Sequence, residues 1–382
     1  LFAGGAFEKA TLFALGIMPY ISASIIIQLM STVVPYFQRL QKEGDAGRKK
    51  ITQVTRYLTV LISAMQAYGI VAVFLPSMSS AGQSVVINPG FSFIFTGTIC
   101  LITGTILLMW LGERITERGI GNGISLIIMI GIVSRLPNVI VSEIALINEG
   151  VRSVLSELIL LAIMFAVISF VVLLTQGTRK IPVSYAKRVV GRKVYGGQST
   201  HIPLKVNTAG VMPIIFAQSI MFIPSTIATF FSESDFMQTV MRWFSFDHPF
   251  YWIVFGLMIV FFTYFYTAIA FDPTQVSQQM KQHGGFIPGI RPGKKTAEYI
   301  DNILSRVTLP GSFALAAVAV FPYVLMQLMD VSYDLASFFG GTSLLIIVGV
   351  ALDTLQQIES HLMSRHYDGF LAKGKIRGRR RI

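Results

Sequence analysis

The sequence predicts an all-α membrane protein that crosses the bilayer several times, and three observations support this prediction. Hydrophobic residues make up 53% of the 382 positions and charged residues only 13%, whereas about 25% of the residues in a soluble domain are charged. Nine apolar segments reach the roughly 20 residues that a spanning helix needs. The connections between these segments alternate between strongly basic and mostly acidic.

The nine predicted spans are continuous apolar runs separated by polar connections. They cover residues 12–34, 57–75, 91–111, 122–141, 157–175, 208–231, 250–271, 308–328 and 340–358. Several contain Gly or Pro, which neighbouring helices accommodate inside a membrane. Residue 1 is Leu rather than Met, so we expect a further span to precede these nine.

Basic residues gather in every second connection, which predicts the orientation. Of the 31 Lys and Arg residues, 27 lie in the connections 35–56, 112–121, 176–207 and 272–307 or in the tail 359–382. The positive-inside rule makes this side cytoplasmic, so the C-terminus is expected in the cytoplasm and Leu1 on the outer side. The net charge of +12 predicts anionic partners such as lipid head groups, an acidic protein face or RNA.

A short string occurs twice, in spans of opposite direction. Residues 16–21 read GIMPYI and residues 210–215 read GVMPII, after which Ala23 aligns with Ala217. The first copy runs from the outside to the inside and the second runs back. Inverted repeats with irregular helices at matching places indicate a pathway between two halves. A chance match between short apolar strings is the alternative.

The sequence shows no motif for catalysis or metal binding. It has no HExxH or GxSxG motif and no pair of intramembrane carboxylates. The single cysteine, Cys100, excludes disulfides and cysteine-based metal sites within the chain. We therefore predict no catalytic residue, cofactor or metal site, and we expect a partner to supply any energy that is needed.

Two other classes of membrane protein can be compared with the pathway that the repeat indicates. A secondary transporter with an inverted repeat usually keeps ionisable groups at mid-membrane, whereas here Asp353 lies near the inner end of the last span. A membrane-embedded enzyme or insertase factor would need a nucleophile and a base, and the sequence offers no such pair.

Five strings spread over the chain resemble the SecY family of protein-export channels. They are FALGIMPYISASII at 13–26, WLGE at 110–113 with TERGIGNGIS at 116–125, QSTHIPLKVN at 198–207, FIPGIRPG at 286–293 and FGGTSLLI at 339–346. The order of the strings matches that family, and their form is bacterial. SecY proteins have ten spans, so the nine found here correspond to the second to the tenth.

The resemblance implies an hourglass pore between two inverted halves, here 12–141 and 157–358. A ring of aliphatic side chains would close its waist: Ile17, Ile21, Ile124, Ile128, Ile215 and Ile346. Two pairs of these share a helix face, because residues four apart lie above one another. The segment 1–11 would be the plug of the outer funnel, with Leu1, Phe2, Ala3, Gly4, Gly5 and Ala6 at its tip.

The resemblance also implies a lateral gate and docking surfaces. The gate would lie between the spans 12–34 and 57–75 on one side and 208–231 and 250–271 on the other. Its polar residues would be Ser22, Gln66 and Asn207. The residues expected to bind partners are Arg291, Lys187, Arg188, Arg192 and Lys193 in the connections 272–307 and 176–207.

Taken together, the residues and the resemblance predict a passive protein-conducting channel of the bacterial cytoplasmic membrane. Unfolded preproteins would cross through it, and signal sequences or membrane helices would leave through the gate. The expected partners are the SecE and SecG subunits, the motor SecA, the ribosome and anionic lipid.

Overall fold

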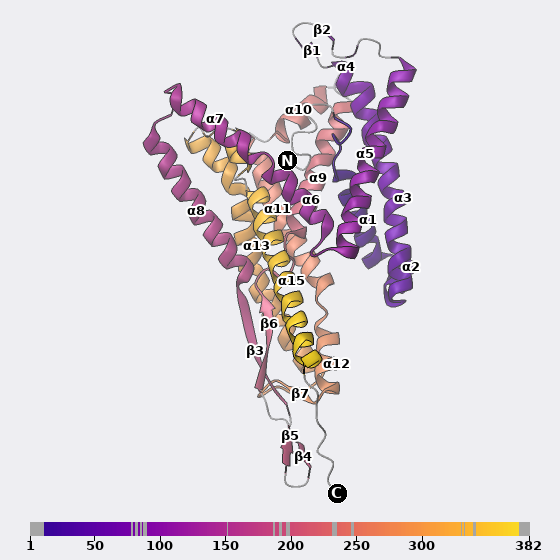
Figure 1. The fold of residues 1–382 in the computed structure, drawn as a ribbon, viewed down its shortest axis with the longest axis vertical. Coiled ribbons are helices and arrows are strands. Elements are labelled where there is room, and N and C mark those ends of the chain that lie inside the picture. Colours follow the sequence, from indigo (N-terminus) through magenta and orange to yellow (C-terminus); the bar gives the residue numbers. More distant parts are fainter. Residues whose placement is uncertain are drawn as a thin grey trace.

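The long helices run side by side along one axis, and most of the strands lie beyond one end of them (Figure 1). The computed structural model describes residues 11–77, 79–80, 83–84, 86, 90–150, 152–185, 188–190, 193–195, 199–230, 235–245, 248–329, 331, 333–338 and 341–373. The plug residues Leu1 to Ala6, the docking residues Lys187 and Arg192, and the tail from residue 374 onward lie outside these residues.

The first half of the chain is built from eight helical elements. They are α1 (Met18–Val33), α2 (Pro35–Lys42), α3 (Asp45–Gly69), a π-helical turn η1 (Ile70–Phe74), α4 (Leu75–Ser77), α5 (Phe91–Arg118), α6 (Gly123–Val133) and α7 (Leu136–Asn148). The short strands β1 (Ser79–Ser80) and β2 (Gln83–Ser84) follow α4.

The described part of the second half of the chain contains helices and five strands. Its helices are α8 (Val154–Gln176), α9 (Met212–Phe230), α10 (Asp235–Trp243), α11 (Pro249–Ala270), α12 (Pro273–Gln282), α13 (Lys294–Met329), α14 (Tyr333–Phe338) and α15 (Gly341–Lys373). Its strands are β3 (Thr178–Tyr185), β4 (Arg188–Val190), β5 (Lys193–Tyr195), β6 (Ser199–Lys205) and β7 (Gly285–Phe286).

Each of the nine predicted spans overlaps a helix. Within the described residues, six stretches are long and apolar enough to cross a membrane: Phe91–Arg118, Gly123–Asn148, Val154–Gln176, Pro249–Gln282, Lys294–Gln327 and Gly341–Met363. A seventh is reached if α1 and α2 form one broken span. The number nine therefore stays a prediction, whereas the mostly helical, multi-span fold is confirmed.

One bend falls at the end of a predicted span and one break falls inside another. The chain bends by 98° between α1 and α2. Val34 at this bend has extended backbone before Pro35, as expected because proline disfavours helical backbone in the residue before it. The predicted span 122–141 is likewise divided into α6 and α7 by a turn at Ser134 and Arg135.

The two large basic connections contain strands that pair in one small sheet. The strand order is β6-β3-β7, and β3 pairs antiparallel with β6 from Thr178 opposite Lys205 to Ser184 opposite Ser199. The sheet has its own apolar core with α12 and the start of α13, namely Ile181, Val183, Leu204, Met280, Ile287 and Ile300. Residues from 176–207 and 272–307 thus form a single body, which we call the basic-end unit.

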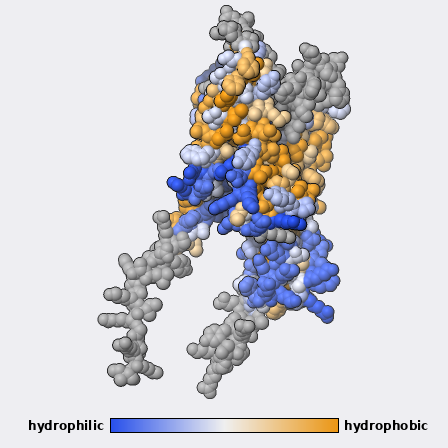
Figure 2. Space-filling view, turned by 90° about the vertical axis from the view of Figure 1, so that its right-hand side faces the viewer, coloured by the Kyte–Doolittle hydropathy of each residue, from blue (hydrophilic) through white to orange (hydrophobic). Residues whose placement is uncertain are grey.

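The surface matches a protein that is surrounded by lipid. Figure 2 shows a broad hydrophobic belt over the helices and hydrophilic side chains gathered toward the end that carries the basic-end unit. On α8, Leu155, Phe165 and Leu173 are each at least 70% exposed. A soluble monomer rarely exposes so large an apolar face, so this belt fits contact with lipid.

Candidate pore and gate

The two copies of the repeated string have the same local structure. Gly16 has φ +55° and Gly210 has φ +64°, a left-handed backbone that glycine adopts at little cost. Each glycine stands two residues before a helix, and Pro19 and Pro213 occupy the second helical position, where a missing N–H costs nothing. The string therefore encodes the same start for α1 and α9.

The aligned alanines of the repeat are also equivalent in packing. Ala23 and Ala217 are both 0% exposed, and α1 contacts α9. The repeat thus lies where the two halves of the molecule meet. Chance similarity of two strings would not predict this shared geometry.

The six isoleucines predicted to form the ring come together in one apolar cluster. Five are buried and Ile124 is half-buried against them; the exposed fractions are 2% for Ile17, 6% for Ile21, 2% for Ile128, 6% for Ile215 and 1% for Ile346. They come from α1, α6, α9 and α15 and from the turn that precedes α1. No member of this set faces lipid.

Two adjoining cavities reach this cluster. One, of about 340 Å³, is lined by Ile21, Ile124, Ile128 and Ile215 together with polar residues of α3 and α5. The other, of about 550 Å³, is lined by Ile128, Ile215 and Ile346 and by polar groups at the basic end, among them Lys205, Asn207, Asp353 and Gln357. We call them the gate cavity and the vestibule. Because both share Ile128 and Ile215, the isoleucines close the inner ends of two partly polar spaces.

We call the contact of α1 and η1 with α9 the gate seam; of the predicted gate residues, Ser22 lies on α1, Gln66 on α3 and Asn207 in the turn before α9. Ser22 and Gln66 are half-buried, and Asn207 is 7% exposed. Although all three are described, no hydrogen bond joins any two of them. The Oδ1 atom of Asn207 is buried without a hydrogen-bond partner, and the side chain lines the vestibule. Apolar side chains of both helices, among them Ile21, Ile25 and Phe216, belong to one buried cluster at this seam.

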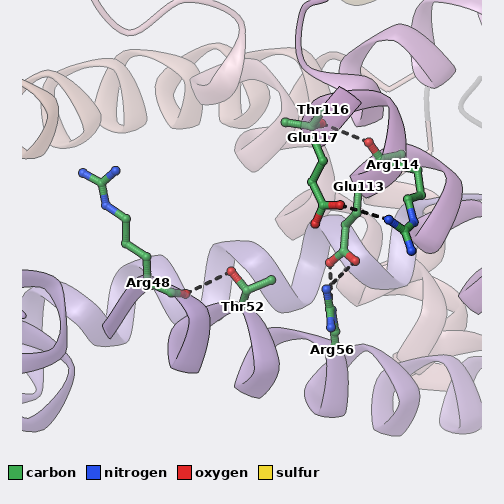
Figure 3. Close-up of polar contacts among 8 residues, drawn as sticks. Arg48, Thr52, Arg56, Glu113, Arg114, Thr116 and Glu117 are labelled. Atoms are coloured by element: carbon green, nitrogen blue, oxygen red, sulfur yellow. Dashed lines mark hydrogen bonds and ion pairs between the residues drawn. The ribbon is translucent and has the colours of Figure 1, made fainter. Parts of the chain in front are cut away.

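An ion pair at the mouth of the gate cavity joins α3 to α5, as Figure 3 shows. The Arg56 Nε and Nη2 atoms donate to the two carboxylate oxygens of Glu113 at 2.9 and 2.7 Å. Arg114 and Glu117 form a looser, exposed pair at 3.4 Å. The sequence did not predict these pairs, because the charges of these connections indicated only the orientation in the membrane.

Hydrogen bonds fix the start of α6 and thereby Ile124 and Ile128. The Asn122 Oδ1 atom accepts from the backbone N–H groups of Ile124 and Ser125 at 3.1 and 3.3 Å. The Thr116 hydroxyl accepts from the Gly123 N–H at 2.8 Å. A side chain at N-cap that satisfies free N–H groups stabilises a helix start, so the string around 116–125 sets the ring position of α6.

The halves also meet on a second side, which we call the back seam. There α6 contacts α15 and α7 contacts α14, and the Gly121 N–H donates to Gln357 Oε1 at 2.7 Å. At the other end of the helices, Arg152 follows α7 and pairs with Glu143 at 2.9 Å and with Glu157 at 3.6 Å. These side chains are only 6–13% exposed.

The basic-end unit presents Arg291 on a fixed loop. Arg291 is exposed, while its carbonyl accepts from the Thr296 hydroxyl at 2.9 Å and the neighbouring Gly293 carbonyl accepts from Ser277 at 2.7 Å. Arg188 and Lys193 belong to the paired strands β4 and β5. In the part of the chain that the structure describes, no group of three or more His, Cys, Asp or Glu side chains could hold a metal ion.

Comparison with known proteins gives a consistent result. The pattern of the SecY family matches residues 11–355. The chain is 47% identical to the protein translocase subunits SecY of Escherichia coli K12 and of Haemophilus influenzae, over 99% of its length and 85% of theirs. It is 46% identical to that of Rickettsia bellii, over 99% of its length and 86% of that protein's.

Solved structures share the fold at lower identity. One is described as a protein-conducting channel, with a TM-score of 0.66 at 17% identity over 95% of this chain and 86% of that one. Another concerns the plug domain of SecY, with a TM-score of 0.65 at 18% identity over 92% and 83%.

Fold and site together define a multi-pass membrane protein of the protein-conducting channel class. The chain belongs to the SecY family, and it is a channel subunit of a protein translocase. Membership of this family argues against a secondary transporter, which was the alternative function that the sequence left open.

Proposed function

We propose that the six isoleucines form the seal of this channel and that polypeptides cross by displacing them. The observation that carries the proposal is the gathering of five buried isoleucines and Ile124 at the inner ends of the gate cavity and the vestibule. Apolar constrictions oppose water and ions by dewetting. Aliphatic side chains make no directional bonds, so the same ring can yield to a substrate of any sequence.

The gate seam opens by separation of α1 from α9. Hydrogen bonds between helices in a membrane contribute only about 0.6 to 2 kcal/mol each, and none joins Ser22, Gln66 and Asn207 in the described chain. Signal sequences carry an apolar core of 7–15 residues, which could replace the apolar contacts of this seam and then enter lipid. The segment from Leu1 to Ala6 acts as the plug on the outer side, on the basis of the resemblance.

The basic-end unit is the docking surface for the partners that drive transport. Exposed Arg291, with Lys187, Arg188, Arg192 and Lys193, provides cations for ribosomal RNA phosphates or for an acidic face of the motor SecA. Structures that share the fold support the ribosome as a partner: one is of Sec61 in the canine ribosome–channel complex, and another is of the yeast Ssh1 complex bound to the 80S ribosome. SecE, SecG and anionic lipid complete the proposed set of partners.

The chain itself performs no catalysis in this proposal, so the energy comes from the motor or from the ribosome. The basic end faces the cytoplasm of a bacterium, in keeping with the positive-inside rule, and the same rule assigns the basic tail to the cytoplasm.

Reconstitution tests the function. Vesicles containing the protein with its partner subunits should take up a secretory precursor only when the motor and ATP are present. Uptake of a small solute driven by a proton or sodium gradient, without precursor uptake, would contradict the channel.

The ring is tested by Ile215→Gly, which should raise the ion conductance of the resting channel in planar bilayers. Ile259→Gly on α11 is the matched control, because Ile259 is 0% exposed in the same cluster but lines neither the gate cavity nor the vestibule. Equal conductance of the two variants would count against the ring.

A further inference from the structure

In each of the two segments that precede α1 and α9, one backbone carbonyl packs closely against a glycine of a neighbouring helix. A methyl group on Gly104 of α5 would lie 2.1 Å from the Leu12 carbonyl oxygen. A methyl group on Gly311 of α13 would lie 2.8 Å from the Val206 carbonyl oxygen. A Cβ atom essentially never lies closer than 3.0 Å to another heavy atom outside its own neighbours, so both positions need glycine while the backbone stays where it is.

The two contacts occupy the same place in the inverted repeat. Leu12 stands four residues before the left-handed Gly16, and Val206 stands four residues before the left-handed Gly210. In both halves the supporting glycine belongs to a long helix that is neither α1 nor α9. Two unrelated close approaches would not be expected to coincide in this way.

Other contacts hold each lead-in segment against the same half of the molecule. Ala14 and Leu15 are 5% and 7% exposed and pack with Leu101 of α5 and with residues of α3 and η1. In the other half, the Val206 N–H donates to the Gly177 carbonyl at 2.8 Å. The glycine contacts are thus part of a packed environment. We call the packing of the Leu12 and Val206 carbonyls against Gly104 and Gly311 the seating.

We propose that Gly104 and Gly311 are positioning residues that set the axial positions of α1 and α9. Through these helices they set the heights of Ile17, Ile21 and Ile215 in the closed channel. An alanine at Gly104 would displace the lead-in segment by at least about 0.9 Å to reach a 3.0 Å contact. This is more than half of the roughly 1.5 Å rise per residue of a helix, so the ring would lose its alignment. The effect on sealing rests on the function proposed above, whereas the seating of the carbonyls does not.

The seating can be measured without any transport, because the native Cys100 lies one helical turn from Gly104. Cys100 and Thr11 line one cavity of about 190 Å³, so Thr11→Cys places a second thiol on the same cavity, and the rate of disulfide cross-linking between the two thiols is the readout. Adding Gly104→Ala should slow this disulfide about fivefold, because a disulfide tolerates little change in the separation of its Cα atoms. Gly256→Ala is the control, since its methyl group would meet Val320 at an ordinary 3.7 Å.

The second measurement is the ion conductance of the resting channel in the complete complex. We expect a rise for Gly104→Ala, a smaller rise for Gly311→Ala and no change for Gly256→Ala, in the order of the overlaps. An unchanged disulfide rate in Gly104→Ala, or equal slowing in Gly256→Ala, would overturn the seating. If Gly104→Ala fails to fold, an unchanged conductance in Gly311→Ala overturns the proposal and a rise supports it. A wild-type channel that passes no precursor would defeat the proposed function but would leave the disulfide result interpretable.

Discussion

The two seams between the halves are built differently. The gate seam brings α1 against α9 through apolar side chains, and at its inner end the Asn207 Oδ1 atom is buried without a partner. The back seam is tied by the Gly121–Gln357 hydrogen bond at one end and by the Arg152 ion pairs at the other. Two halves that are fastened on one side and only packed on the other can part on the packed side. The difference indicates how a channel can open sideways without coming apart.

The largest effect is expected from breaking the buried ion pairs of the back seam. Arg152→Ala would remove the guanidinium that pairs with the Glu143 and Glu157 carboxylates, which are 6% and 13% exposed. Removing one partner of a buried pair costs about 3–5 kcal/mol, so we expect a loss of stability near the lower end of this range. Thermal or denaturant unfolding in detergent measures it.

The matched control for this prediction is Arg114→Ala. Its pair with Glu117 is 44% and 58% exposed, and exposed pairs contribute only about 0 to 1 kcal/mol. Similar losses in the two variants would remove the distinction between a fastened seam and an ordinary surface.

A smaller and opposite effect is expected at the gate seam. Asn207→Leu replaces a buried amide whose oxygen has no hydrogen bond, and burying such a group costs about 1–3 kcal/mol. The closed state should therefore gain about 1 kcal/mol, and precursors with weakly apolar signal sequences should be exported roughly fivefold more slowly. Export assays with a graded series of signals measure this, with Ser22→Ala as the control. Faster export of weak signals in Asn207→Leu would contradict the account.

The smallest effect is expected from Gln357→Ala, which removes one hydrogen bond of the back seam. A single neutral hydrogen bond contributes about 0.5–1.5 kcal/mol, and here Gln357 is exposed, so the loss should lie at or below the lower bound. Unfolding should change little, while hydrogen exchange at the Gly121 amide should accelerate. Unchanged exchange there would show that this bond does not tie the seam.

Much of the fold and of the pore could be predicted from the sequence. Each span was visible as an apolar run, because lipid requires one. The ring of isoleucines was predicted from the resemblance to the SecY family, and the spacing of Ile17 with Ile21 and of Ile124 with Ile128 supported two pairs of it. Val211, which aligns with Ile17 and lines the vestibule, was missed although the repeat itself pointed to it.

The connections were predicted less well because their charges concealed a second pattern. Ile181 and Val183 stand at alternate positions with Pro182 between them, and Ile202 and Leu204 do the same around Pro203 in the paired strand. This spacing is typical of a strand, but the basic residues of these connections predicted only the orientation in the membrane. Pairing of β3 with β7, about 100 residues away along the chain, is a tertiary contact that no local pattern predicts. The partners of Arg152 are near in sequence, at Glu143 and Glu157, but their pairing depends on the turn between α7 and α8, which periodicity does not define.

The basic-end unit has a mechanical consequence. Its strand β3 continues directly from α8, and β6 leads within a few residues into α9, while the sheet is locked to α12 and α13 by a common core. A force on this sheet would therefore reach α8 and α9 through short connections, one residue between α8 and β3 and six residues between β6 and α9. Because α9 carries Ile215, we expect movement of the sheet and movement of this isoleucine to be coupled.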